Sequence, residues 1–173
     1  AIRRAAEHLA ARGGGTLIFP PGRYLTGTIP LCSDLTVELR RGAVVAASPD
    51  LRDYVEDAAA NPASGLRHYL FEGRGVRNVA LRGDGTIDGN GDAYWEPHPS
   101  PSARVMRAKK RRPVLVHLVD CERVAVRDVS IVNAPAYTIW LLGCRGAAVS
   151  GVTVRNKRNG PNTDVLDIDC CRS

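Results

Sequence analysis

The segment Cys121-Glu-Arg-Val124-Ala-Val126 is followed 23 residues later by Cys144-Arg-Gly-Ala147-Ala-Val149. The same template occurs upstream at Cys32-Ser-Asp-Leu35-Thr-Val37 and at Val76-Arg-Asn-Val79-Ala-Leu81, and another copy begins at Cys171. The steps between successive anchors are 44, 45, 23 and 27 residues. A period of this size is typical of a solenoid, whose units bury their apolar faces by stacking on one another.

Each unit alternates between apolar and polar residues with a period of two, as at Val124 and Val126. Asp128 in one unit and Gly151 in the next predict a bend between two short strands. Three short strands per turn, stacked in register, form a right-handed parallel β-helix, so we expect an all-β fold. The steps of 44 and 45 residues fit either double turns or single turns lengthened by loops.

The cysteines are predicted to stack, because equivalent residues of successive turns lie above one another. Cys32, Cys121, Cys144 and Cys171 then belong to an inward ladder that they share with Val76. Neighbouring turns lie ~4.8 Å apart, which leaves disulfides geometrically possible. Since free Cys behaves as a small buried hydrophobe, the position shared with Val favours unpaired core thiols.

The 173 residues are interpreted as one incomplete β-helix domain, residues 1–173. Residues 1–13 predict a capping helix that ends at Gly13, and residues 14–173 form the first turns, with loop excursions near 50–70 and 89–113. The apolar stripe of the helix is Ile2, Ala5, Ala6, Leu9 and Ala10. The far end has no cover in the sequence, so we expect the amino-terminal part of a solenoid that is truncated at its C-terminal end.

Charge narrows the range of partners. The 24 Lys and Arg residues outnumber the 18 Asp and Glu residues, which gives a formal net charge of +6 and suits a nucleic acid or an acidic polysaccharide. The basic run from Arg107 to Arg112 lacks interleaved aromatic residues for base stacking, so we interpret it as a solvated loop. No segment approaches the ~20 apolar residues of a membrane helix, which excludes a membrane span.

The stretch from Gly83 to Asp92 partly matches two ligand-binding motifs. As a dinucleotide fingerprint it has Asp88 where the third Gly belongs, and as a calcium loop it has Trp95 in place of the closing Glu. We interpret its glycines as turn residues. The four histidines have no metal-ligand spacing. His117 lies in the strand-like stretch 114–119 and could face a cleft, but we expect it to be an ordinary surface or edge side chain. We predict neither a metal site nor a cofactor.

Three carboxylates lie within six residues, at Asp164, Asp167 and Asp169. On one straight strand Asp164 would face away from the other two, although a corner between them could change this. Exposed acids on the sheet of a solenoid can act as acid and base in cleaving a glycosidic bond. The alternative is a set of solvated turn aspartates, with Asn162 and Thr163 bonding to the local backbone. Spacing alone favours that alternative.

Several segments together resemble the amino-terminal part of the catalytic domain of glycoside hydrolase family 28, the polygalacturonase-type enzymes. The matching pieces are Gly13-Gly-Gly-Thr16, Phe19-Pro-Pro-Gly-Arg-Tyr24, Gly83-Asp-Gly-Thr-Ile-Asp-Gly89 with Trp95, Arg112-Pro113 leading to Cys121, Asn133-Ala-Pro-Ala-Tyr-Thr138 and Pro161-Asn-Thr-Asp164. The resemblance implies a pectin-lyase-like β-helix that hydrolyses α-1,4-galacturonosyl linkages in pectin by an inverting mechanism.

By this resemblance Asp164 is the catalytic carboxylate on the water-activating side, supported by Asn162, Thr163 and Asp167. The general acid would come from an Asp-Asp pair one turn later, followed by Gly-His-Gly and Arg-x-Lys segments. None of these segments follows Asp164 in this chain, so we expect it to be inactive alone. Val165 replaces a common Gly and Trp140 a common His, which bears on the substrate rather than on the fold.

Three other functions remain open: a rhamnogalacturonan hydrolase, a pectate-lyase-like eliminase and a non-catalytic polysaccharide-binding β-helix. The expected partner is an acidic polysaccharide, with no nucleic acid and no membrane, and the full-length protein is expected to be a monomer. Because polymeric pectin is extracellular, the resemblance implies a secreted or periplasmic protein.

Overall fold

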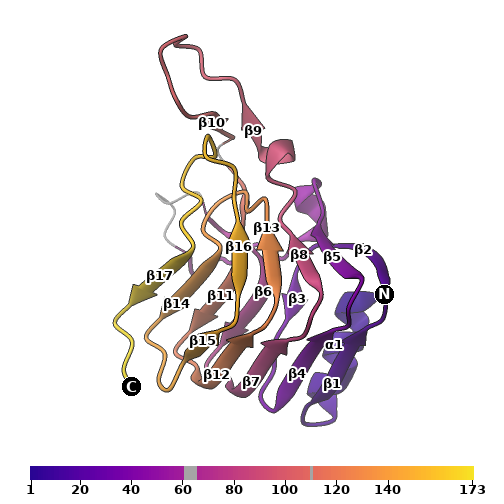
Figure 1. Ribbon diagram of the computed structural model, residues 1–173. Coiled ribbons are helices and arrows are strands. Elements are labelled where there is room, and N and C mark those ends of the chain that lie inside the picture. The colour runs from indigo at the N-terminus through magenta and orange to yellow at the C-terminus, as the bar shows by residue number, and fades with distance from the viewer. Residues whose placement is uncertain (61–65, 110) are drawn as a thin grey trace.

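The computed structural model describes residues 1–60, 66–109 and 111–173, which form one helix and three parallel sheets (Figure 1). The chain passes from sheet A to sheet B to sheet C and returns to sheet A one level higher, so each circuit makes one coil of three strands. Five such coils are stacked in the described residues. This arrangement confirms the predicted β-helix.

The strands of each sheet follow in coil order. Sheet A contains β1 (Gly15–Phe19), β4 (Leu35–Leu39), β7 (Arg77–Arg82), β12 (Glu122–Arg127) and β15 (Ala148–Ser150). Sheet B contains β2 (Gly22–Thr26), β5 (Ala43–Ala47), β8 (Thr86–Asp88), β13 (Ser130–Val132) and β16 (Thr153–Arg155). Sheet C contains β3 (Ile29–Pro30), β6 (His68–Arg74), β11 (Pro113–Val119), β14 (Ile139–Leu142) and β17 (Leu166–Asp169).

The register of sheet A places the repeat anchors above one another. Arg77 pairs with Glu122, and isolated bridges join Glu122 to Arg145 and Arg145 to Arg172, so the residues that precede them stack as Val76, Cys121, Cys144 and Cys171. Thr36 pairs with Ala80. The 44- and 45-residue steps are therefore single coils lengthened by long turns.

The core lies inside the coils and consists of stacked aliphatic side chains. Cys121 and Cys144 are completely buried in it, and Cys32 and Cys171 pack against it. All five cysteines are free thiols, of which Cys170 is exposed. The predicted bends are present, since Asp128 and Gly151 both have positive φ angles, of 63° and 65°.

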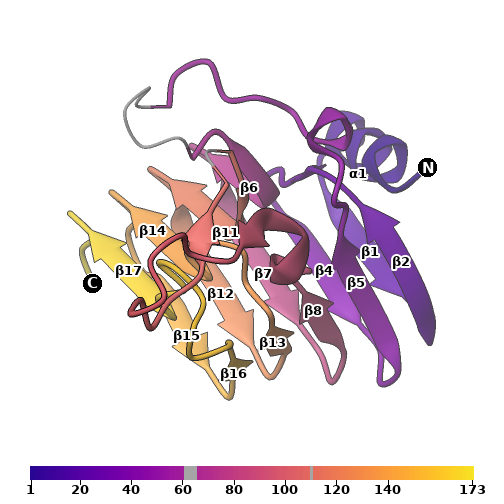
Figure 2. The same cartoon turned by 90° about the horizontal axis from the view of Figure 1, so that it is seen from above.

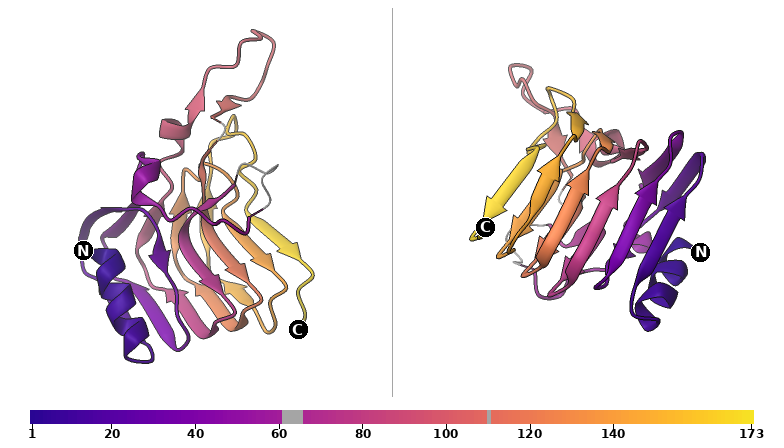
Figure 3. Two further views of the ribbon diagram at one scale, coloured as in Figure 1. Left: turned by 180° about the vertical axis from the view of Figure 1, so that it is seen from behind. Right: turned by 60° about the horizontal axis from the view of Figure 1, so that its bottom comes forward.

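The helix α1 (Ile2–Ala11) covers the N-terminal end of the core (Figure 3, left). Ala6 is fully buried, and Ile2 and Leu9 pack on the core. Ala5 and Ala10 are exposed, so the predicted apolar stripe was too wide. Among the described residues, no helix reaches the length and hydrophobicity that crossing a bilayer requires.

The turns from sheet B to sheet C differ from the others in length. After the first coil they run over residues 48–67, 89–112, 133–138 and 156–165, and we call this side of the molecule the B–C corner. Two of these turns carry further elements, η1 (Leu51–Asp53), η3 (Gly91–Tyr94), β9 (Trp95–Glu96) and β10 (Arg107–Ala108). β9 and β10 form an antiparallel pair that projects from the coils at the top of Figure 1, and Figure 2 views the stacked coils from that side.

Candidate functional site

A cavity of about 380 Å³, which we call the acidic cavity, lies between the B–C corner and the outer face of sheet C. Four successive turns each contribute one lining residue, namely Leu66, Arg112, Tyr137 and Asn162. The strands β14 and β17 contribute Trp140, Asp167 and Asp169. Residues more than a hundred positions apart thus meet because successive coils stack in register.

Two of the three predicted carboxylates, Asp167 and Asp169, line this cavity, and the third, Asp164, precedes them in the turn that leads into β17. β17 begins at Leu166, so Asp164 lies in the turn before the strand and is exposed. Asp167 is half-buried and its pKa is raised, mainly by burial and further by the charges of Asp164 and Asp169. The corner therefore brings Asp164 into the electrostatic range of Asp167, from which it would face away on a straight strand.

The turn that carries Asp164 is fixed by the side chain of Asn156. Its amide nitrogen donates to Oγ1 of Thr138 and to the carbonyl oxygen of Thr163, at 2.9 Å each, and its Oδ1 accepts from the backbone N–H of Ala134 at 3.0 Å. The N–H of Thr138 in turn donates to the carbonyl of Asp164 at 2.9 Å. Asn156 was not predicted as a site residue, because an Asn in a polar turn carries no distinguishing signal.

Arg112 holds the start of the same turn. Its Nη1 donates to the carbonyls of Pro161 and Pro135 at 2.8 and 3.3 Å, and its Nη2 donates to Oδ1 of Asn162 at 3.0 Å. Arg112 is only 8% exposed. The prediction that the run ending at Arg112 is solvated is therefore wrong for this residue, because turns from later coils cover it; Lys110 of that run lies outside the described residues.

The alternative interpretation, in which Asn162 and Thr163 bond only to the local backbone, is wrong for both residues. The side chain of Asn162 accepts from Arg112, which is 50 residues away in the sequence. The carbonyl of Thr163 accepts from Asn156. Both predicted supporting residues are thus held by groups from outside their own tripeptide.

A column of side chains leads along sheet C to the acids. The register places Glu72, His117, Trp140 and Asp167 side by side. His117 is 3% exposed and stacks on Tyr69 with ring centroids 3.9 Å apart, so the prediction of a surface or edge residue is wrong. Burial lowers the pKa of His117 to about 4, which keeps the imidazole neutral near pH 7.

Trp140 connects this column to the acids. Its ring lies 4.8 Å from that of His117 and its Nε1 donates to Oδ2 of Asp169 at 2.7 Å. Oδ2 of Asp167 is buried and has no hydrogen-bond partner among the described residues. The two acids of β17 therefore differ, since one carboxylate accepts a strong donor and the other is desolvated.

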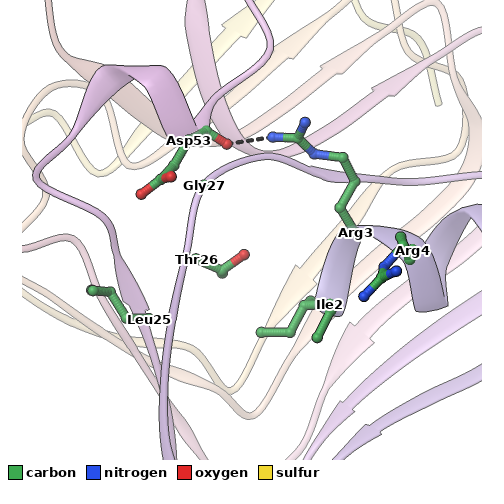
Figure 4. Close-up of a pocket in the computed structure, with 8 residues that line it drawn as sticks. Ile2, Arg3, Arg4, Leu25, Thr26, Gly27 and Asp53 are labelled. Atoms are coloured by element: carbon green, nitrogen blue, oxygen red, sulfur yellow. Dashed lines mark hydrogen bonds between the residues drawn. The ribbon is translucent and has the colours of Figure 1, made fainter.

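A second hollow, of about 410 Å³, lies where α1 meets the first coils and differs from the acidic cavity in chemistry (Figure 4). Arg3 reaches across it to the carbonyl of Asp53, while the carboxylate of Asp53 accepts from Ser48. Its single lining carboxylate is thus already engaged, and no second acid lies beside it among the described lining residues. Among the described residues, no group of three or more His, Cys, Asp or Glu is arranged to hold a metal ion.

The acidic cavity and the turn that precedes β17 together hold groups that could act in a hydrolysis. Asp164 is an exposed carboxylate that can accept a proton from water, and Asp167 retains its proton to higher pH than an ordinary Asp. The neighbouring rings of Trp140 and Tyr137, with centroids 5.6 Å apart, offer apolar surface to a ligand.

Comparison with known proteins finds one matching family. The model of Glycosyl hydrolases family 28 matches residues 24–173. The chain is 28% identical over 169 residues to a "Probable polygalacturonase" of Vitis vinifera, covering 93% of this chain and 33% of that protein. It is 28% identical over 164 residues to a "Polygalacturonase" of Persea americana, covering 92% and 33%. The chain spans about a third of the length of these relatives.

Two solved structures share the fold. The hyperthermoactive exopolygalacturonase of Thermotoga maritima superposes with a TM-score of 0.79 at 24% identity, over 98% of this chain and 45% of that one. The polygalacturonase of Erwinia carotovora superposes with a TM-score of 0.74 at 18% identity, over 95% and 47%. The stacked coils described above are thus the β-helix of these proteins over part of its length.

Proposed function

This chain belongs to glycosyl hydrolases family 28, and we propose that it forms part of an enzyme that hydrolyses α-1,4-galacturonosyl linkages of pectin or polygalacturonate with inversion at the anomeric carbon. The polygalacturonase names of its relatives and the net charge of +6, which suits an acidic polymer, support this substrate.

The observation that carries the proposal is the position of Asp164. Its carboxylate is exposed where the turn of the fifth coil enters sheet C, and its backbone is fixed by Thr138. We assign to Asp164 the role of general base, which activates the attacking water. Asn162 and Thr163 hold the turn, and Asp167 supports the site from the adjacent strand.

Inversion requires a second carboxyl group, which protonates the leaving oxygen from ~6.5–9.5 Å across the sugar ring. The family resemblance assigns that group to an Asp-Asp pair in a following coil, and this sequence contains no such pair after Asp169. We therefore propose that the 173-residue polypeptide alone does not hydrolyse polygalacturonate.

Release of reducing ends from polygalacturonate tests both statements. We expect no release by the 173-residue polypeptide; release that disappears in Asp164→Asn would contradict its proposed inactivity. In a longer product of the same gene that contains the pair, Asp164→Asn is expected to lower kcat by about 10²–10⁴-fold. The matched control is Asp84→Asn, a change to an exposed acid paired with Arg41 away from the cavity, which leaves kcat unchanged.

The alternative functions give other products. An eliminase releases an unsaturated sugar that absorbs ultraviolet light and loses activity in chelator, and a rhamnogalacturonan hydrolase cleaves the decorated polymer in preference to polygalacturonate. Binding of polygalacturonate by the longer protein without cleavage would indicate a non-catalytic relative. We also propose that the protein acts outside the cytoplasm, where polymeric pectin is found, which cell fractionation would test.

A further inference from the structure

The guanidinium of Arg112 is a buried charge without an acidic partner. It is 8% exposed, and its three hydrogen bonds go to neutral acceptors, the carbonyls of Pro135 and Pro161 and the amide oxygen of Asn162. None of the ion pairs between described residues includes it. Buried arginines are otherwise nearly always paired with an anion, because removing an unpaired charge from water is costly.

Arg112 still has donors to offer. A guanidinium has five N–H groups, and the three hydrogen bonds leave two of them without a partner among the described residues. Arg112 also lines the acidic cavity, where it is the one cationic side chain among the described lining residues. Arg112 therefore supplies the positive charge at the border of the space that a ligand would fill.

The surroundings limit which anion can bind there. Asp167 and Asp169 line the same cavity and repel a small free anion. A carboxylate attached to a larger neutral body can offset this repulsion, because the body gains contact with Trp140 and Tyr137 while the carboxylate meets Arg112. The cavity volume of about 380 Å³ falls within the ~300–1,000 Å³ usual for small-molecule sites.

We infer that Arg112 binds the carboxylate of one uronic acid residue in this cavity and thereby selects the free acid over its methyl ester. The inference rests on the proposed function, because it takes the ligand to be a galacturonan. It adds a specificity-determining residue in the turn before β11, separate from the carboxylates that carry the reaction.

Binding of two ligands by the wild-type chain tests this without any substitution. The probes are tri-galacturonate and its fully methyl-esterified form, titrated calorimetrically at pH 7 and low salt. We expect the free acid to bind about tenfold or more tightly than the ester, which is the gain from one charge-assisted hydrogen bond. Added salt should reduce this ratio of affinities. Equal affinities would overturn the assignment.

Substitution then identifies the residue responsible. In Arg112→Gln the preference for the free acid is expected to disappear, whereas in Arg111→Gln, which removes the adjacent exposed charge, it is retained. Thermal unfolding establishes that each variant is folded. A folded Arg112→Gln protein that still prefers the free acid overturns the assignment.

A third variant separates loss of the contact with the ligand from loss of structure. This is needed because Arg112 also fixes the turn at Pro161 and Asn162. Arg112→Lys keeps the charge and loses the planar pair of donors, so we expect a preference between that of the wild type and none. An undiminished preference in Arg112→Lys overturns the assignment. A wild-type chain that binds neither ligand contradicts the proposed function as well, whereas an unchanged preference in the variants contradicts only the role of Arg112.

Discussion

The indole Nε1 of Trp140 donates a hydrogen bond to Oδ2 of Asp169 at 2.7 Å, between adjacent strands of sheet C. Asp167, which pairs with Trp140 in the same ladder, has a buried Oδ2 that accepts from no described residue. One acid of β17 thus accepts a hydrogen bond from Trp140, whereas the other lies where burial disfavours its ionised form. The two carboxylates of β17 are predicted to respond differently to substitution.

Replacing Asp167 by Asn is expected to stabilise the fold at neutral pH. The pKa of Asp167 is raised above the unfolded value of 3.8, so its ionised form costs stability once the pH exceeds the folded pKa. We expect Asp167→Asn to increase the free energy of unfolding at pH 7 by up to about 1 kcal/mol, and the gain to vanish near pH 3.5. Urea unfolding at the two pH values measures this, with Asp169→Asn, expected to give no gain, as the matched control. A destabilised Asp167→Asn at pH 7 would contradict the prediction.

The buried imidazole of His117 predicts a loss of stability in mild acid. Between the ordinary His pKa of 6.5 and the folded value of about 4, the unfolded chain takes up a proton that the folded chain excludes. The free energy of unfolding should thus fall as the pH drops through this window, by at most about 3 kcal/mol. His117→Phe keeps the stacking on Tyr69 and should flatten this slope in urea unfolding from pH 7 to pH 4.5.

Burial also lowers the pKa of His68, so this residue contributes to the slope with the same sign. His68→Phe is expected to remove a further part of it, and the double variant most of it. A slope that is the same in His117→Phe and in the wild type would show that the ring titrates normally in the folded protein.

Asn156 is expected to control the order of the turn that carries Asp164. Asn156→Ala removes three hydrogen bonds and leaves the carbonyl of Thr163 without that donor, which should cost about 1–3 kcal/mol. The amide of Thr138, bonded to Asp164, should exchange its hydrogen faster. Asn159→Ala, an exposed change in the same turn, is the control, and equal exchange rates in the two variants would refute this role.

Two glycines with positive φ differ in what a methyl group would meet. At Gly83, with φ of +118°, an added Cβ would lie 2.2 Å from the carbonyl oxygen of Leu39, whereas at Gly75, with φ of +61°, it would meet nothing within 4 Å. Gly83→Ala is expected to destabilise the protein by more than about 3 kcal/mol, and Gly75→Ala by about 1 kcal/mol. The denaturation midpoints of the two variants would rank their stabilities. A lower midpoint for Gly75→Ala than for Gly83→Ala would contradict the close approach of Gly83 to the carbonyl oxygen of Leu39.

The sequence repeat predicted the stacking of the coils because the anchors at Cys121 and Cys144 occupy equivalent positions. It did not predict the length of the earlier coils, since a step of 44 residues fits one turn or two. Only the pairing of Thr36 with Ala80 decides that question. Long turns have no period of their own, so the local pattern cannot reveal how much chain they contain.

The candidate site was predictable in part. Asp164, Asn162, Thr163 and Asp167 were identified from one short motif, and their roles in the reaction remain predictions. Arg112 was missed because its burial depends on carbonyl groups 23 and 49 residues further along the chain. The burial of His117 was missed for a similar reason, since its stacking partner Tyr69 comes from another coil.

The placement of the long turns at the B–C corner separates the scaffold from the recognition surface. Changes in the length of residues 89–112 or 156–165 need not disturb the ladders of sheets A and B, because these turns lie outside the strand pairing. Related polymers could therefore be accommodated by insertions and deletions at a single edge, while the coils stay constant. This arrangement makes the fold a suitable starting point for transplanting loops between carbohydrate-active proteins.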